Sequence, residues 1–225
     1  TVAETQIIRL ADANAIAIRR FDRAQGRRIH SISAGTAIRA ATASGAEPDM
    51  GYPALARILR RIGCAEGAAN QHDAKELFRR MVFNILVDNT DDHEKNHALL
   101  IERPFDYGQV RLAPAYDILP TNSGQGFQEF ICGAHGRDAT LENGMSQCDA
   151  FGLSPAEAAA EVMGVVAVVN GWQAHFEKTG VSPGDIRSLA ERIDGEDLLN
   201  QRTGFDAARY QGNAPKRQKK SPFHP

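Results

Sequence analysis

The chain has 225 residues, of which 42% are hydrophobic, and a formal net charge of -2 at neutral pH. This size and composition predict a globular protein with one domain or two small lobes. The small net charge excludes an overall positive field, so nucleic acid could be contacted only through a local patch or through a partner. The 3 cysteines are widely spaced and form no C-x-x-C pair, so neither a disulfide framework nor a cysteine zinc site is indicated.

No segment has the features of a membrane span or of a secretion signal. The longest apolar-rich stretch, AAAEVMGVVAVVNGW, contains Glu161 and is shorter than the roughly 20 residues that a span needs. No positively charged segment followed by an apolar one opens the chain. We therefore expect a cytoplasmic protein with no membrane contact. The chain starts abruptly at Thr1, and we expect it to be part of something longer.

The first third of the chain predicts a hairpin followed by helices. Alternation in TQIIR and NAIAI around Asp12-Ala13-Asn14 predicts two strands, which would be the last strands of a sheet whose remainder is absent. A short helix is expected near SAGTAIRAATA, and a loop in ASGAEPDMGYP. PALARILRRIG predicts the next helix, with Pro53 in its first turn and Gly63 as its C-terminal cap.

A longer helix is predicted for DAKELFRRMVFNILV, where Leu77, Met81 and Ile85 belong to one apolar stripe. Arg79 and Arg80 lie outside this stripe, and we expect both to face solvent. After a polar stretch, HALLIE and QVRLAPAYD predict two strands joined by a turn at residues 104–108. The polar stretch therefore lies on a loop between the helix and the hairpin.

The remainder of the chain is predicted to be helical up to a tail. SPAEAAAEVMGVVAVVNGWQAHFEKTG has Ser154 and Glu157 at capping-box spacing, and PGDIRSLAERI has Pro183 near its start. The fold class is therefore mainly α with short β-hairpins. Residues 201–225 lose periodicity and end in the basic APKRQKKSPFHP, which predicts a disordered solubilising tail, with phosphate contact as the alternative.

The polar stretch, DNTDDHEKNH, permits a first interpretation as a metal site. Residues 93–97 match H-E-x-x-H, in which two histidines one helical turn apart bind zinc and the Glu deprotonates its water. The surroundings argue against this interpretation. A zinc-binding helix should run for several turns with apolar flanks, whereas polar residues precede the motif and Pro104 follows soon after it. Lys95 would also place a positive charge beside the metal.

Phosphoryl transfer is the second interpretation. Protein kinases use a loop Asp to orient and deprotonate the substrate hydroxyl, and an Asn five residues later to hold magnesium. Asp91 and Asn96 have this spacing. A further carboxylate is needed after a short hairpin, where it bridges magnesium between phosphates. Asp117 in LAPAYDILPT stands at that position.

Taken together, N-T-D-D-H-x-K-N-H and L-A-P-A-Y-D-I-L-P resemble the HipA-like serine/threonine kinases of bacterial toxin-antitoxin systems. ELFRRMVFNILV, AIRRFDR and RIH add to this resemblance, which covers about residues 5–120 firmly and the helical remainder loosely. It implies the carboxy-terminal lobe of a protein-kinase-like fold. Residues 1–24 would be the final strands of the amino-terminal lobe and the hinge, and residues 25–200 the helical lobe.

The resemblance also implies cofactors and site residues. ATP and Mg²⁺ would be bound, with Asp91 as catalytic base and with Asn96 and Asp117 as magnesium ligands. The backbone around Arg19 to Phe21 would contact adenine. Two residues between Asp91 and Asn96 would have further roles. His93 would help to hold the loop, and Lys95 would reach a phosphate oxygen.

Each of these residues also has a simpler structural explanation. Asp91 could cap a helix, Asn96 could be a turn residue, and Asp117 could cap a turn. His93 and Lys95 could be structural or solvated, and Phe21 could belong to the core. The joint spacing of the two aspartates and the asparagine favours the kinase interpretation over these separate explanations.

Parts of a complete kinase are missing from this sequence. No G-x-G-x-x-G occurs, and no lysine precedes Lys75, so an amino-terminal lobe would have to come from elsewhere, including a separate chain. For partners, the resemblance implies a protein substrate carrying Ser or Thr, such as a component of translation. It also implies a small DNA-binding antitoxin of the HipB type, through which alone DNA would be contacted. A non-catalytic lobe that binds an antitoxin remains the alternative.

Overall fold

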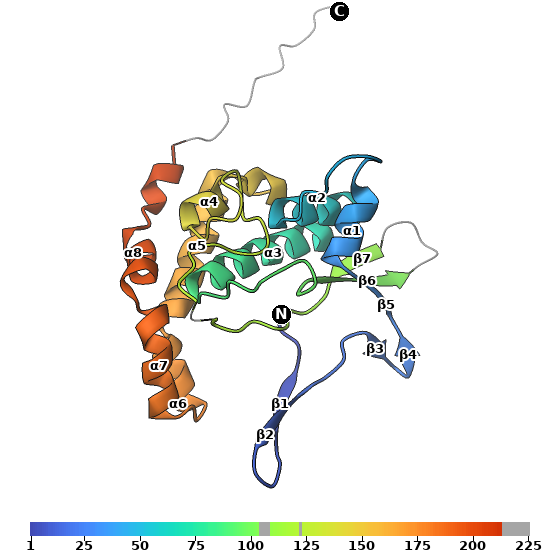
Figure 1. Cartoon of the computed structure of the whole chain (residues 1–225). Helices are drawn as coiled ribbons and strands as arrows, with labels where there is room; N and C mark the ends of the chain where they lie inside the picture. The colour runs from blue at the N-terminus through green and yellow to red at the C-terminus, as the bar shows by residue number, and fades with distance from the viewer. Residues whose placement is uncertain (104–108, 122, 213–225) are drawn as a thin grey trace, which may run out of the picture.

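Two small hairpins extend from a mainly helical body (Figure 1). The computed structural model describes residues 1–103, 109–121 and 123–212. The strands in these ranges are β1 (Thr5–Arg9), β2 (Asn14–Ile18), β3 (Arg23–Ala24), β4 (Arg27–Arg28), β5 (His30–Ser33), β6 (Ala98–Arg103) and β7 (Gln109–Leu112). The helices are α1 (Ala34–Ala41), α2 (Tyr52–Ile62), η1 (Glu66–Ala68), α3 (Ala69–Leu86), α4 (Leu141–Met145), η2 (Cys148–Phe151), α5 (Pro155–Asn170), α6 (Trp172–Lys178), α7 (Pro183–Ile193), α8 (Glu196–Gly204) and η3 (Ala207–Tyr210).

The predicted first hairpin is confirmed. Strands β1 and β2 pair in antiparallel fashion, with Thr5 opposite Ile18 and Ile7 opposite Ile16. Because side chains alternate along a strand, these isoleucines share one face of the ribbon. That face is open to solvent, since Ile7 is 70% exposed and Ile16 is 69% exposed.

A three-stranded sheet follows the polar loop of residues 87–97. Strand β6 lies in the middle, paired in antiparallel fashion with β5 on one side and β7 on the other. The β6–β7 hairpin was predicted, although its turn, residues 104–108, lies outside the described residues. The pairing of β5 with β6 was not predicted, because it joins segments about seventy residues apart. It brings the start of α1 next to residues 93–97.

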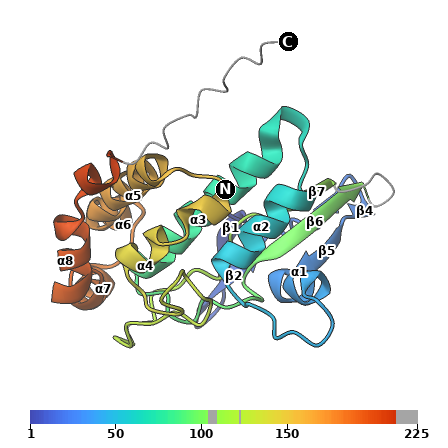
Figure 2. The same cartoon turned by 90° about the horizontal axis from the view of Figure 1, so that it is seen from above.

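Helix α3 forms the centre of the core (Figure 2). Its predicted apolar stripe is fully buried, and it packs against α2, α5 and the segments around α4. Pro53 lies in the first turn of α2, and Gly63 is the C-terminal cap, as predicted. A Cβ at Gly63 would lie 2.2 Å from the Leu59 carbonyl oxygen, so only glycine fits this close approach.

The prediction that Arg80 faces solvent is wrong. Its exposed fraction is only 6%. The guanidinium Nη1 donates to the Ala113 carbonyl at 2.9 Å, and Nε donates to Glu76 at 3.2 Å. Arg79, by contrast, is half exposed and pairs with Glu161. Sequence pattern places both arginines off the apolar stripe, but only the packing of the segment after β7 over α3 covers one of them.

Helices α5 to α8 form the other end of the body (Figure 2). The capping box of α5 is present between Ser154 and Glu157, as predicted. Regular structure continues beyond residue 200, where the tail was expected to begin. Helix α8 runs to Gly204, and Phe205 and Tyr210 pack on the core. The basic cluster at residues 216–220 lies outside the described residues. The three cysteines are buried, and none of them forms a disulfide with another.

Candidate functional site

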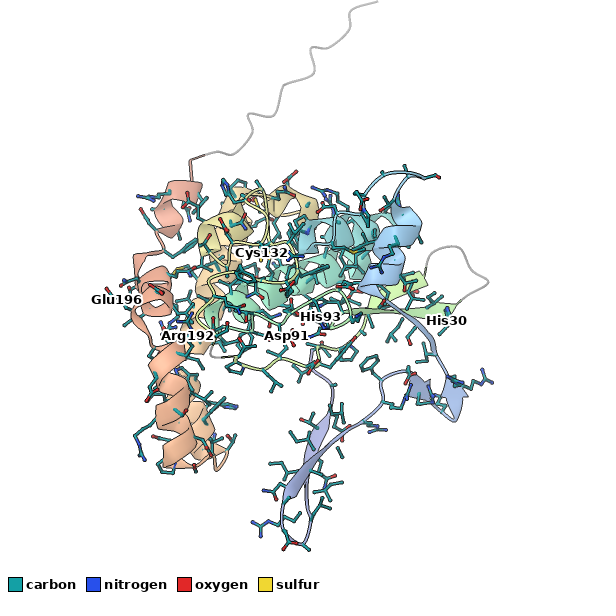
Figure 3. The ribbon with its side chains drawn as sticks, viewed as in Figure 1. His30, Asp91, His93, Cys132, Arg192 and Glu196 are labelled. Carbon is teal, nitrogen blue, oxygen red and sulfur yellow. The ribbon has the colours of Figure 1, made fainter. Side chains whose placement is uncertain are left out.

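Residues 87–97 form an irregular loop that connects α3 to β6. Four predicted site residues, Asp91, His93, Lys95 and Asn96, lie on it. Asp91 and Lys95 are exposed, His93 is half-buried, and Asn96 is buried. Figure 3 shows Asp91 and His93 between the helical body and the N-terminal hairpins. The loop therefore presents a carboxylate and an ammonium group to solvent, and its remaining polar groups point inward.

A buried hydrogen-bond network beneath the loop fixes its course. Asp92 is only 1% exposed and accepts a hydrogen bond from the Tyr52 hydroxyl. Asn84 of α3 donates to the same hydroxyl oxygen at 2.9 Å, and His97 Nε2 lies 3.1 Å from the Asp92 carboxylate. Burial and the charge of Asp92 raise the pKa of Tyr52, so its hydroxyl remains a donor. A buried carboxylate needs such partners.

The first turn of helix α1 packs against the loop of residues 87–97. The backbone N–H of Ala34 donates to the His97 carbonyl at 2.8 Å, and that of Gly35 donates to the Glu94 carbonyl at 3.3 Å. Ser33 caps the helix. A Cβ at Gly35 would lie 2.4 Å from Glu94 Cγ, so glycine permits the close contact between helix and loop. The first N–H groups of α1 are thus satisfied by loop carbonyls.

Asp117 lies next to this loop. It follows β7 by five residues, is exposed, and has a φ of +58°. A non-glycine residue in this left-handed region is uncommon, and such conformations concentrate at functional sites. Asn96 Nδ2 lies 3.5 Å from the Asp117 carbonyl oxygen, and the Tyr116 hydroxyl donates to the Lys95 carbonyl at 2.7 Å. The two predicted magnesium ligands are therefore neighbours in space.

A cavity of about 410 Å³ opens beside Tyr116. The predicted adenine contacts line it, together with the ends of β2 and β5: Ile18, Arg19, Arg20, Phe21, Asp22, Ser31, Ile32, Ser33, Ala98 and Tyr116. The rings of Phe21 and Tyr116 are 5.4 Å apart between centroids. Burial and the charge of Asp117 raise the pKa of Tyr116. One aromatic pair thus connects the predicted hinge to the predicted metal ligands.

Charged groups at the rim of this cavity are already paired. Arg20 holds the pKa of Asp22 well below its usual range through two hydrogen bonds, of 2.8 and 2.6 Å. Arg19 forms an ion pair with Glu4 at 3.0 Å, and its backbone N–H donates to the Glu4 carbonyl. The Arg19 N–H is therefore engaged within the protein.

Three residues that shape the site were not predicted: Tyr116, Asp92 and His97. Tyr116 carries a weak signal in the sequence, because an aromatic residue directly precedes Asp117. Asp92 and His97 carry none, since nothing in an irregular polar stretch says which carboxylate or imidazole turns inward. The structure shows that His97, rather than His93, bonds the loop interior, while His93 Nδ1 only accepts from the Lys95 N–H at 3.3 Å.

The geometry does not support the zinc interpretation. Residues 93–97 form turns rather than a helix, so the two imidazoles do not lie on one helical face. His97 points into the core, where it stacks on Phe130 at 5.4 Å between ring centroids. Within the described ranges, no three His, Cys, Asp or Glu side chains are placed to hold a metal ion together.

The family model of the HipA-like C-terminal domain matches residues 1–172. The chain belongs to this family. A chain of the Shewanella oneidensis MR-1 toxin-antitoxin complex of HipA, HipB and operator DNA has the same fold, with a TM-score of 0.66 at 15% sequence identity. The alignment covers 95% of this HipA-like chain and 54% of that chain, so the domain spans about half of its structural relative. No curated protein matched the sequence.

The HipA-like domain contains no helix, among its described residues, that is long and apolar enough to cross a membrane. Its family match ends within the helical body, at Trp172. The candidate site lies wholly inside the matched range, whereas α7, α8 and η3 lie beyond it.

Proposed function

We propose that this chain is the carboxy-terminal lobe of an ATP- and magnesium-dependent serine/threonine protein kinase of a toxin-antitoxin system. One observation carries the proposal. Asn96 and Asp117, predicted as magnesium ligands from two separate motifs, lie against each other beside the cavity that Phe21 lines.

Each side chain has a distinct role in this proposal. Asp91 is exposed on the loop, where it orients a Ser or Thr hydroxyl and accepts its proton as the oxygen bonds to the γ-phosphorus of ATP. The bond from that phosphorus to the bridging oxygen breaks, and ADP leaves. The Asn96 amide oxygen and the Asp117 carboxylate suit magnesium, which prefers oxygen ligands and would neutralise charge on the phosphates. Phe21 and Tyr116 present aromatic surface to the base.

A second lobe is part of the proposal. The lysine and glycine-rich loop that cover the phosphates in kinases are absent from this sequence, and the chain corresponds to about half of its structural relative. The exposed isoleucine face of β1–β2 supports strand pairing or packing with further polypeptide of that lobe, because isolated two-stranded ribbons are marginally stable. That polypeptide belongs to the same protein or to a separate chain.

The partners follow from the family. We propose a protein substrate carrying Ser or Thr, such as a translation component, and a HipB-type antitoxin that provides the contact with DNA. The Shewanella oneidensis relative was solved with HipB and operator DNA, which supports the antitoxin. ATP and such partners imply action in the cytoplasm.

Calorimetric titration with a non-hydrolysable ATP analogue, with and without Mg²⁺, tests the proposal. Asp117→Asn removes the charge while tolerating the left-handed backbone, and it should abolish the Mg²⁺-dependent part of binding. Asp12→Asn, in the exposed turn of the first hairpin, is the matched control and should bind as the wild type does. Mg²⁺-dependent binding that Asp117→Asn leaves unchanged would overturn the proposed metal ligand and favour the non-catalytic, antitoxin-binding alternative. No binding by the wild-type chain would mean that the site needs the second lobe.

A further inference from the structure

Asp88, three residues before the proposed base, forms a bidentate ion pair with Arg192 of α7. The carboxylate accepts from Arg192 Nε at 2.8 Å and from Nη2 at 3.1 Å. Both side chains are largely removed from water, with exposures of 4% for Asp88 and 18% for Arg192. Paired, forked geometry of this kind is stronger and more directional than an exposed ion pair. The contact joins segments 104 residues apart in the chain.

The backbone of Asp88 joins two loops. Its φ is +57°, a second left-handed non-glycine residue near the site. Its carbonyl oxygen accepts from the Thr121 N–H at 2.9 Å and from the Thr121 hydroxyl at 2.8 Å. Thr121 lies four residues after Asp117. Holding Asp88 in place therefore holds the segment that carries the proposed metal ligand.

Thr121 also contacts the loop of residues 87–97, which carries Asp91. Thr90 Oγ1 lies 2.6 Å from Thr121 Oγ1, and Thr90 directly precedes Asp91. Gly124 lies against the Arg192 guanidinium. A Cβ at this position would lie 3.3 Å from Arg192 Nη1, so the backbone passes directly over the guanidinium. A continuous set of polar contacts thus runs from α7 to both sides of the site.

Helix α7 is itself firmly placed. Ser182 caps its first turn, and Ile186 and Ile193 are buried in the core. The helix lies beyond residue 172, where the family match ends. Figure 3 shows Arg192 on the side of this helical segment that faces the loop of Asp91. The ion pair therefore connects the loop of Asp91 to a residue outside the matched range.

We propose that Arg192 is a positioning residue: through Asp88 it holds residues 87–97 and residues 117–121 in the relative arrangement that Asp91, Asn96 and Asp117 require. The catalytic meaning of this arrangement rests on the proposed kinase function. The positioning itself is a property of this chain and can be measured without nucleotide.

Amide hydrogen exchange of this chain tests the positioning directly. Arg192→Ala should speed exchange at least tenfold at the Thr121 amide and across residues 87–97, and leave α2 and α5 unchanged. Arg187→Ala, an exposed arginine on the same helix, is the matched control and should change neither segment. Unchanged exchange at Thr121 overturns the proposal. Acceleration spread over the whole chain also overturns it, because that result describes a general loss of stability.

Arg192→Ala leaves the Asp88 carboxylate buried and unpaired. If this variant fails to fold for that reason, a double variant provides the test. Asp88→Gly/Arg192→Met removes both charges and permits the left-handed backbone, and it should show the same local acceleration. Arg192→Lys, which keeps the charge without the fork, should restore part of the protection. No restoration by lysine, together with no effect of the double variant, overturns the role of the pair.

Titration with the ATP analogue then separates positioning from function. If the wild type binds with Mg²⁺, Arg192→Ala should weaken the Mg²⁺-dependent affinity at least tenfold while Arg187→Ala does not. Unchanged affinity in a folded Arg192→Ala chain overturns the link between the pair and the site. If the wild-type chain does not bind by itself, nucleotide binding requires the second lobe, and local acceleration at Thr121 still supports the positioning role.

Discussion

Asp117 and Asp88 have the same unusual backbone conformation for different reasons. Asp117 is exposed, with its carboxylate directed to no charged partner among the described residues, whereas Asp88 is buried and paired with Arg192. Aspartate tolerates the left-handed region better than most residues, yet it still costs free energy there. In Asp88 the ion pair compensates for this cost. In Asp117 we attribute the conformation to the proposed role at the metal.

Asp91→Asn tests the proposed base. In the proposed kinase with both lobes present, the variant should lose phosphoryl transfer by roughly a hundredfold to ten-thousandfold, because the amide cannot accept the proton. Nucleotide affinity should stay within about twofold, since Asp91 is not a proposed ligand of the nucleotide or the metal. Transfer of labelled phosphate and calorimetry measure the two quantities. Activity retained in Asp91→Asn would remove this residue from the mechanism.

Two adjacent arginines of α3 provide a matched comparison of burial. Arg80→Ala removes hydrogen bonds to the Ala113 carbonyl and to Glu76, and should lower the free energy of unfolding by roughly 2–4 kcal/mol. Arg79→Ala removes only an ion pair from a half-exposed side chain and should cost at most about 1 kcal/mol. Urea unfolding of both variants measures the difference. Equal losses would show that Arg80 is not buried in solution.

At the scale of elements, several helices begin at residues whose local chemistry favours a helix start. Serines cap α1, α5 and α7, and Pro53 and Pro183 lie in first turns where no backbone donor is needed. Glycine at residue 35 lets α1 approach the loop of residues 87–97. These local signals decide where an element starts, and only contacts between elements decide what it touches.

The capping box of α5 should make stability depend on pH. The backbone N–H and hydroxyl of Ser154 donate to Glu157 and hold its pKa below the ordinary 4.5. Because the folded-state pKa is the lower one, the carboxylate stabilises the fold above pH 4.5, and this contribution is lost as pH falls through the folded-state value. Glu157→Gln should therefore be less stable than wild type at pH 7, by at most about 1 kcal/mol, and equal to it in acid.

Chemical unfolding of wild type and Glu157→Gln at pH 7 and at about pH 3 gives the two differences. Ser154→Ala provides the control, because it removes the hydroxyl donor and should reduce the same pH dependence. A difference between wild type and Glu157→Gln that stays constant over this range would exclude the carboxylate from the cap.

At the scale of the whole molecule, the helical body buries its apolar side chains, whereas the first hairpin exposes them. The core extends continuously from α1 to α7, whereas β1 and β2 extend from it and expose apolar side chains on their isoleucine face (Figure 1). Exposed apolar patches of this kind mark interaction surfaces or cause association. The hairpin is the part of this chain that further polypeptide would cover.

Ile7→Thr/Ile16→Thr should leave the stability of this chain within about 0.5 kcal/mol of wild type and reduce its self-association. Both side chains are exposed, so no packing is lost. Leu99→Thr on β6 is the contrasting control, because that side chain is fully buried and its replacement should cost roughly 2–5 kcal/mol. Thermal unfolding and light scattering measure the two effects. A large loss in the hairpin variant would mean that this face is packed in solution.

Much of the fold followed from the sequence by itself. Alternation predicted β1–β2 and β6–β7, and apolar spacing and caps predicted α2, α3, α5 and α7. These features depend on neighbours within a few residues, or on a spacing that chemistry requires. The juxtaposition of Asn96 with Asp117 is the one long-range prediction that the described geometry supports, and the resemblance carried it.

Tertiary structure alone decided the rest. Burial of Arg80 depends on which segment crosses α3, the inward turn of Asp92 and His97 depends on Tyr52 lying beneath the loop, and the pairing of Asp88 with Arg192 joins segments 104 residues apart. None of these contacts can be predicted from neighbouring residues, because the sequence gives the type of a charged side chain but not its environment. Its environment is set by elements that arrive from far along the chain, and burial and partners then determine what the charge does.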